Sequence, residues 1–336
     1  MEMEKTIETH SGKFMLRPYR NEDETSVIAL WELAFNQKMN PAIWRWKFHD
    51  NPFGRQMMLC LNESGEPVAM YAGIPFTANW NGKSIRMTQL IDNMSHPGYR
   101  QVISGRKGLF VETSKYFFEL YGGKQASVYH YGFPGIKHFK LGKIFLEYGV
   151  VGDGGVYLES DLKKVEKPGI MYFGKVEKND HFNIRFDDLW ENNKVHYPFA
   201  VCRNRTFLTW RFSHHPINKY QIYSYKTANG NLKCYLVLLI QGSSASIVDI
   251  FSGLDENPFK WLIYKVKNEL SNSGVGMVNI WLPKDHFMPS MLDKMGFIQK
   301  HEPLGVVPTG RCFDQALDFE FTARNIFYTM ADGDLL

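Results

Sequence analysis

The stretch GRKGLF, residues 105–110, has the residue types best suited to holding a ligand. It follows a β-type run and opens a helical one, and the first N–H groups of a helix lack partners and favour negative charge. Its two glycines would let the backbone approach a ligand closely, and nearby basic residues add positive charge. The stretch therefore predicts an anion site suited to a pyrophosphate. The residues predicted to bind it are Arg100, Gly105, Arg106, Lys107, Gly108 and Leu109.

This stretch matches neither the phosphate loop GxxxxGK[ST] nor the dinucleotide pattern GxGxxG, so a mononucleotide or nicotinamide site is not predicted. A Gly-containing turn between a strand and a helix also occurs without a ligand, and the residues alone leave that alternative open.

Other kinds of chemistry find little support in the sequence. There is no GxSxG or Cys–His signature of a covalent nucleophile. His214 and His215 are adjacent, so on a helix they would point about 100° apart, and no third metal ligand is near them. The four cysteines have no zinc-ligand spacing and are expected to be reduced. No metal is predicted.

Composition favours a globular protein in the cytoplasm. The chain has 336 residues, 44% of them hydrophobic, and a net charge of +4, which is too mild to indicate nucleic-acid binding. The first residues are charged and do not resemble a signal peptide, and the longest apolar run, YLVLLI, is too short to span a membrane.

Periodicity predicts the elements of the first half. Helices are expected over 23–37, 42–48, 111–121 and 134–143, and strands over 13–19, 55–61, 67–76, 84–94, 127–133 and 145–150. Tight turns at 63–65 and 81–82 indicate an antiparallel meander. The second half repeats this order, and its last predicted element is a strand, DFEFTAR, at 318–324.

The repeat is also visible in short motifs. WKFHDNP at 46–52 returns as WRFSHHP at 210–216, and three further landmarks recur in the same order: Gly65 with Gly230, Asp92 with Asp249, and Gly142 with Gly296. We therefore predict two copies of one fold, the first over residues 1–160 and the second over 161–336. The alternative is that two unrelated α/β domains share a motif by chance.

The order of elements, the stretches HPGYR and RKGLF, and the Leu-Gly pair near the end of the next helix resemble the GCN5-related N-acetyltransferase (GNAT) superfamily. WRWKFHDNPFG is similar to bacterial members with two such domains in tandem. The resemblance covers about residues 13–330. It implies an α/β (α+β) fold of two GNAT-like domains, each a mixed, mostly antiparallel sheet flanked by helices.

The resemblance further implies that acetyl-coenzyme A sits where two neighbouring parallel strands splay, with its pyrophosphate on a turn of the pattern Q/R-x-x-G-x-G/A. Gly108 matches the central Gly. Phe110 stands where the last Gly or Ala is expected and Gly105 where Gln or Arg is expected, so Arg106 would supply the charge from the next position.

Two catalytic roles follow from the resemblance. The family often places a Tyr four residues before the Gly of the helix end, where it protonates the leaving thiolate. Gly142 sets that position at His138, whose imidazole can donate a proton. Gly296 sets the same position at Leu292, which cannot donate a proton, so the second copy is expected to be catalytically silent. Asp92 is the best-placed carboxylate for the general base. A surface histidine and a structural aspartate remain the alternatives.

The implied function is an acyl-CoA-dependent N-acetyltransferase that moves an acetyl group directly to an amine, with an amino sugar as candidate acceptor and the second domain shaping the acceptor site. Three alternatives stay open: a non-catalytic CoA- or ligand-binding protein, a homo-oligomeric scaffold, and an aminoacyl transferase of the Fem type. The last should show a basic groove, which the mild charge does not favour.

Overall fold

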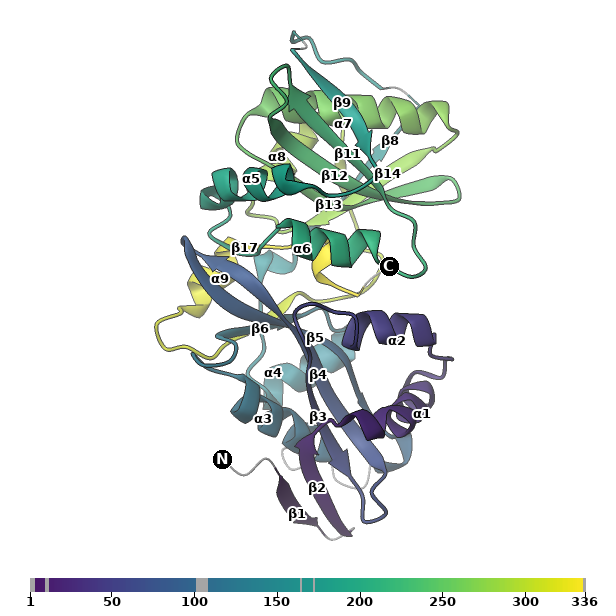
Figure 1. The fold of residues 1–336 in the computed structure, drawn as a ribbon, viewed down its shortest axis with the longest axis vertical. Helices are drawn as coiled ribbons and strands as arrows, with labels where there is room; N and C mark the ends of the chain where they lie inside the picture. The colour runs from purple at the N-terminus through teal and green to yellow at the C-terminus, as the bar shows by residue number, and fades with distance from the viewer. Residues whose placement is uncertain (1–3, 10–11, 101–107, 164, 172, 335–336) are drawn as a thin grey trace. The chain divides into compact units, whose positions relative to one another are not determined.

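The computed structural model describes the chain except residues 1–3, 10–11, 101–107, 164, 172 and 335–336. It divides into two compact units (Figure 1). The first unit consists of residues 1–77, 85–149 and 309–319, and the second of 78–84, 150–308 and 320–336.

The first unit is a mixed sheet with helices packed on it. Its strands lie in the order β1-β2-β3-β4-β5-β6-β16-β7, with β1 to β4 antiparallel, β5 and β6 parallel, and β16 antiparallel to β6. The strands are β1 Lys5–Thr9, β2 Gly12–Pro18, β3 Gln56–Leu61, β4 Pro67–Trp80, β5 Lys83–Ser95, β6 Tyr129–Gly132, β7 Gly149–Val150 and β16 Thr309–Cys312. The helices are α1 Glu24–Phe35, α2 Pro41–Phe48, α3 Leu109–Tyr121 and α4 Ile136–Phe145.

Side chains of the flanking residues cap helix α2 at both ends. Asn40 accepts a hydrogen bond from the Ala42 amide at 2.9 Å, and Pro41 fills the first helical position. At the other end the Asn51 amide donates to the Lys47 carbonyl at 3.1 Å and to the Gly54 carbonyl at 2.9 Å. The motif at 46–52 is therefore a helix stop, with Trp46 buried beneath it.

The second unit repeats this plan. Its sheet has the order β15-β8-β14-β13-β12-β11-β9, with one parallel pair, β13 and β14, on either side of helix α7 in the sequence. The strands are β8 Val156–Asp161, β9 Gly174–Asn179, β10 Phe199–Val201, β11 Gln221–Thr227, β12 Leu232–Gln241, β13 Ser244–Ser252, β14 Met277–Leu282, β15 Ile298–Lys300 and β17 Ile326–Phe327. The helices are α5 Ile184–Asn193, α6 Arg205–Leu208, α7 Glu256–Asn272 and α8 Phe287–Asp293, and α9 spans Phe319–Asn325 at the change from one unit to the other.

Two mostly antiparallel sheets flanked by helices confirm the predicted fold class. Two elements differ. The strand predicted at 145–150 is confined to β7 at Gly149–Val150, and the strand predicted at 318–324 is helix α9. There the alternation of Phe319 and Phe321 with polar residues is typical of a strand, but Thr322 is the buried residue of a helical turn. Tertiary packing overrode a short local pattern.

Each of the two sheets contains a strand that comes from the other half of the sequence. β16, from the second half of the chain, lies between β6 and β7, and β8, from the first half, lies between β14 and β15. The predicted division at residue 160 is a single cut, whereas the structural units interleave at 78–84, 150–160 and 309–319.

Candidate active site

A cavity of about 530 Å³ lies in the first unit, where the end of β5, the first turn of α3 and one face of α4 meet. It is lined by Gly108–Val111 of α3, Asn93–Ser95 of β5, and Lys137, His138, Leu141 and Phe145 of α4, together with Ala34, Phe35, Val68, Tyr99 and Arg100. Its size falls in the usual range for small-molecule sites, roughly 300–1,000 Å³.

The parallel strands β5 and β6 separate beside this cavity. Their ladder runs from the Met87–Tyr129 pair to the Gln89–Tyr131 pair, and β5 then continues to Ser95 beyond the end of β6 at Gly132. Asp92 interrupts the extended backbone with a φ of 50°, in the left-handed region that few non-glycine residues adopt. The last residues of β5 thus extend past the end of β6, and Asn93–Ser95 among them line the cavity.

The first turn of α3 faces the cavity with its backbone. Gly108 is the N-cap residue and brings no side chain, while its carbonyl accepts from the Glu112 amide at 2.9 Å. The N–H groups that follow the cap have no acceptor inside a helix and carry the positive end of the helix dipole. Gly108 and Leu109 therefore lie where the sequence predicted an anion-binding turn. Gly105, Arg106 and Lys107 lie outside the described residues.

Arg100 lines the same cavity and ties the end of β5 to α1. Its guanidinium donates to the Ser95 carbonyl at 3.0 and 3.2 Å and to the Ala34 carbonyl at 3.4 Å. Among the described residues these hydrogen-bond partners are neutral, so they do not neutralise the charge of Arg100 at the cavity wall.

His138 lies on the cavity face of α4. Its ring packs edge-to-face against Phe110 with the centroids 5.4 Å apart, and Phe110 in turn packs on Tyr71 at 5.6 Å. Burial lowers the pKa of His138 below its usual value, so the ring is mainly uncharged at neutral pH. The Phe110 side chain stands where the family pattern has Gly or Ala, and it is one of the groups that pack against His138.

Asp92 lies elsewhere and is not among the described residues that line the cavity. Its carboxylate accepts from Trp31 Nε1 of α1 at 3.0 Å and pairs with Lys47 Nζ of α2 at 3.1 Å. The side chains of Lys47 and Asp92 are 6% and 8% exposed. The structure therefore brings His138 and the α3 turn together but holds Asp92 against the two first helices.

The corresponding place in the second unit is filled by the chain itself. The β13–β14 ladder runs to the Ile247–Ile280 pair, and the short helix Met330–Asp332 then contacts both strands. Asp249, the counterpart of Asp92, accepts hydrogen bonds from Arg203, Tyr235 and Thr329, and Arg203 also pairs with Asp332. These groups are buried, so this part of the second unit is packed interior.

Comparison with known proteins agrees with this geometry. Residues 15–131 match the family model of the acetyltransferase (GNAT) domain. These residues, about a third of the chain, lie mostly in the first unit, and the match agrees with the resemblance seen in the sequence. No curated protein matches the chain.

Solved structures share the fold over most of the chain. A GCN5-related N-acetyltransferase from Anabaena variabilis aligns with a TM-score of 0.66 and 11% identity, over 89% of this chain and 73% of that one. The glucosamine N-acetyltransferase region of a fungal multi-domain β-N-acetylglucosaminidase gives 0.58 and 14%, over 88% and 38%. Saccharomyces cerevisiae N-myristoyltransferase with bound myristoyl-CoA gives 0.57 and 11%, over 99% and 91%.

Among the described residues, no helix combines the length and the apolar character needed to cross a membrane.

Proposed function

We propose that the protein is an acyl-CoA-dependent N-acyltransferase whose donor site is the cavity of the first unit. The observation that carries this proposal is the meeting of three features in one cavity: the start of α3 at Gly108–Leu109, the end of β5 that extends past β6, and His138. A GNAT domain covers these parts of the chain up to residue 131.

The residues present fit a coenzyme A thioester. Its phosphates would lie on the backbone N–H groups at the start of α3, near Arg100. The end of β5 beyond Gln89 no longer pairs with β6 and can hydrogen-bond an amide-containing arm. As co-substrate, acetyl-CoA would supply the activated acyl group, and the chain supplies binding and orientation.

His138 is proposed as the group that returns a proton to the departing thiolate. It lies in the cavity next to Phe110, and a protonated imidazole is a competent donor. Asp92 was the sequence candidate for the base. Its two partners, the buried Lys47 and the half-buried Trp31, favour a positioning role, in which it holds α1 and α2 against β5.

The acceptor is proposed to be a small-molecule amine, with an amino sugar as the first candidate. Support for the sugar comes from the shared fold with the fungal glucosamine N-acetyltransferase region. The second unit, whose own cleft is filled by residues 330–332, is proposed to help shape the acceptor site rather than to bind a second donor.

The test is calorimetric titration of acetyl-CoA into the full chain and into a matched pair of variants. Leu141 lines the cavity, so Leu141→Glu adds a negative charge that repels the donor phosphates, and Leu141→Gln has nearly the same shape without the charge. We expect the Glu variant to bind about tenfold more weakly than the Gln variant, equivalent to about 1.4 kcal/mol.

Wild-type protein should then release coenzyme A when glucosamine or another amine is added. Absence of acetyl-CoA binding by the folded wild-type chain would contradict the proposal. Binding without turnover on any amine would instead leave a CoA-binding protein.

A further inference from the structure

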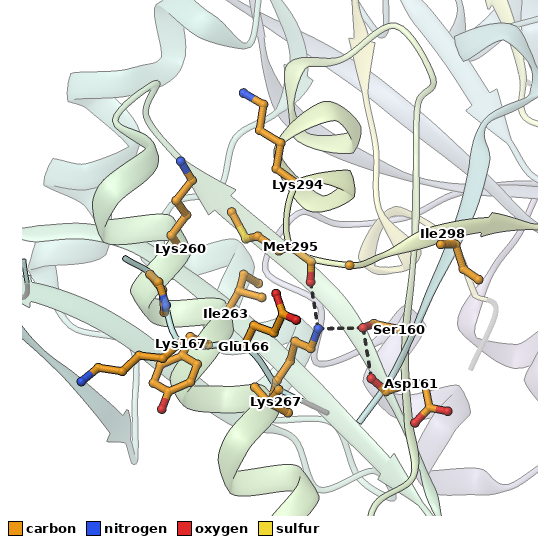
Figure 2. Close-up of a pocket in the computed structure, with 14 residues that line it drawn as sticks. Ser160, Asp161, Glu166, Lys167, Lys260, Ile263, Lys267, Lys294, Met295 and Ile298 are labelled. Atoms are coloured by element: carbon orange, nitrogen blue, oxygen red, sulfur yellow. Dashed lines mark hydrogen bonds between the residues drawn. The ribbon is translucent and has the colours of Figure 1, made fainter. Parts of the chain in front are cut away.

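A second cavity, of about 460 Å³, lies in the second unit between α7, the end of α8, β8 and the segment 165–168 (Figure 2). Positive side chains predominate in its lining: lysines 167, 260, 267 and 294 against the carboxylates of Asp161 and Glu166. All of its lining residues belong to the second unit, so it is separate from the proposed donor site.

Lys267 forms the base of this cavity, and only 6% of the residue is exposed. Its ammonium group donates to Ser160 Oγ at 2.7 Å and to the Met295 carbonyl at 2.9 Å, and both acceptors are neutral (Figure 2). Among the described residues Lys267 makes no salt bridge. An ammonium group has three N–H donors, so one remains available after these two bonds.

A buried ammonium group with neutral partners is costly, because burial removes its hydration without supplying a counter-charge. Burial accordingly lowers the pKa of Lys267, and the carboxylate of Glu166 opposes this shift. Glu166 is exposed and lies on a segment without helix or strand. The carboxylate that acts on Lys267 is therefore held by an exposed segment without regular secondary structure.

Two further lysines hold positive charge at the other end of the cavity. Lys260 and Lys294 both pair with Glu256, at 2.6 and 2.8 Å, and these two hydrogen bonds lower the pKa of Glu256 to about 2. One carboxylate is thus shared by two ammonium groups, so the rim keeps an excess of positive charge. An anion with more than one charge would match this lining better than a singly charged one.

We propose that this cavity binds a small molecule through a phosphate group, with Lys267 as the cation at its base. The third N–H of Lys267 would donate to a phosphate oxygen, and the phosphate would replace Glu166 as the counter-charge. The apolar side chains of Ile263 and Ile298 would contact the rest of the ligand.

The Ser160–Lys267 pair does not act as a nucleophile. Ser160 is only 2% exposed, and the backbone N–H groups of Met295, Gly296 and Phe297 already donate to carbonyls at the end of α8. These three N–H groups of the described chain are therefore not available to stabilise an oxyanion, and we assign the pair to binding.

The experiment measures the thermal stabilisation of the full chain by inorganic phosphate, with sodium chloride at equal ionic strength as the reference. We expect phosphate to raise the Tm of the wild-type protein and the Lys267→Met variant to lose that shift. Lys265→Met is the matched control, because Lys265 lies on the same helix, is exposed and does not line the cavity. It should keep the full shift.

Substitutions at two exposed positions, Glu166 and Ile298, test the proposal without changing the buried Lys267. Glu166→Gln removes the competing carboxylate and should tighten phosphate binding. Ile298→Glu should weaken it about tenfold relative to Ile298→Gln, because the two differ only in charge.

A parallel titration with phenyl phosphate identifies the source of the group. Tighter binding than inorganic phosphate supports an ester ligand, and equal binding supports free phosphate. A phosphate shift equal to that of chloride, or one that survives in both Lys267→Met and Ile298→Glu, would overturn the proposal.

Discussion

At the scale of single residues, the chemistry of the proposed donor cavity depends on the packing of Phe110 against His138. The aromatic ring packs edge-to-face against the imidazole, and burial lowers the pKa of His138, so the protonated form is a minority at neutral pH. A proton donor with a low pKa works best below neutrality, whereas the amine acceptor must be uncharged and works best above it. Comparing the pH dependence of the wild-type protein and a His138 variant separates the protonation of the donor from the deprotonation of the amine.

Replacing His138 with Ala should lower kcat more than it weakens acetyl-CoA binding. Because only the protonated imidazole can donate, the wild-type to His138→Ala ratio of kcat should be largest at acidic pH and shrink as the pH rises above the lowered pKa. The effect of general-acid catalysis is typically about 10²–10⁴-fold. Steady-state rates from pH 5.5 to 9 check this, and a ratio that stays constant over that range would remove the assigned role.

Among the elements of the first unit, Asp92 joins three that are distant in sequence: β5, α1 and α2. The carboxylate fixes Lys47 and Trp31 on the side of the strand where its backbone turns into the left-handed region. A buried ion pair of this kind is weak evidence for stability, but loss of one partner leaves an uncompensated charge. Asp92 should therefore matter first for the placement of the helices.

Asp92→Asn and Lys47→Met should each destabilise the fold by about 3 kcal/mol, since each removes one partner of a buried ion pair. The double variant should cost less than the two losses added together. Asn tolerates the left-handed backbone, so the test isolates the charge. Urea unfolding of all four proteins measures the coupling. Unchanged stability in Asp92→Asn with lost turnover would instead favour the role of general base.

Local elements of this fold were predictable from the sequence, and long-range pairings were not. The Asn40–Pro41 start of α2 and the Gly turns of the meander are local signals, and the structure has the predicted helices there. The end of β5 and the turn at Gly108 could also be located. The wall formed by Phe110 over His138 depends on how α3 packs beside α4, and no local pattern specifies such a contact.

For the whole molecule, the main feature is that each sheet is completed by a strand from the other half of the sequence. In the first unit β16 pairs with β6, and Gly310 lies directly against the ring of the buried Tyr129. A Cβ at Gly310 would come within 1.7 Å of the Tyr129 hydroxyl. Only glycine fits between β16 and this ring.

Gly310→Ala should therefore destabilise the first unit by about 1–3 kcal/mol through overpacking, although it lies in the second half of the sequence. Gly169→Ala is the control, because a Cβ at Gly169 meets no described atom. Hydrogen exchange of the amides in β5 and β6 locates the effect. Faster exchange confined to the second unit would contradict the assignment of β16 to the first.

The pairing of strands from opposite halves of the sequence also affects when each sheet can form during synthesis. The ribosome must pass residue 312 before β16 can pair with β6 in the sheet beside the proposed donor cavity. It must also reach Asp332 before the buried Arg203 can form its second ion pair. Nascent chains that stop short of these points would expose an unpaired strand edge and an isolated buried cation. Incomplete products should therefore be recognised by chaperones and proteases, and only a chain translated through both segments would escape that surveillance.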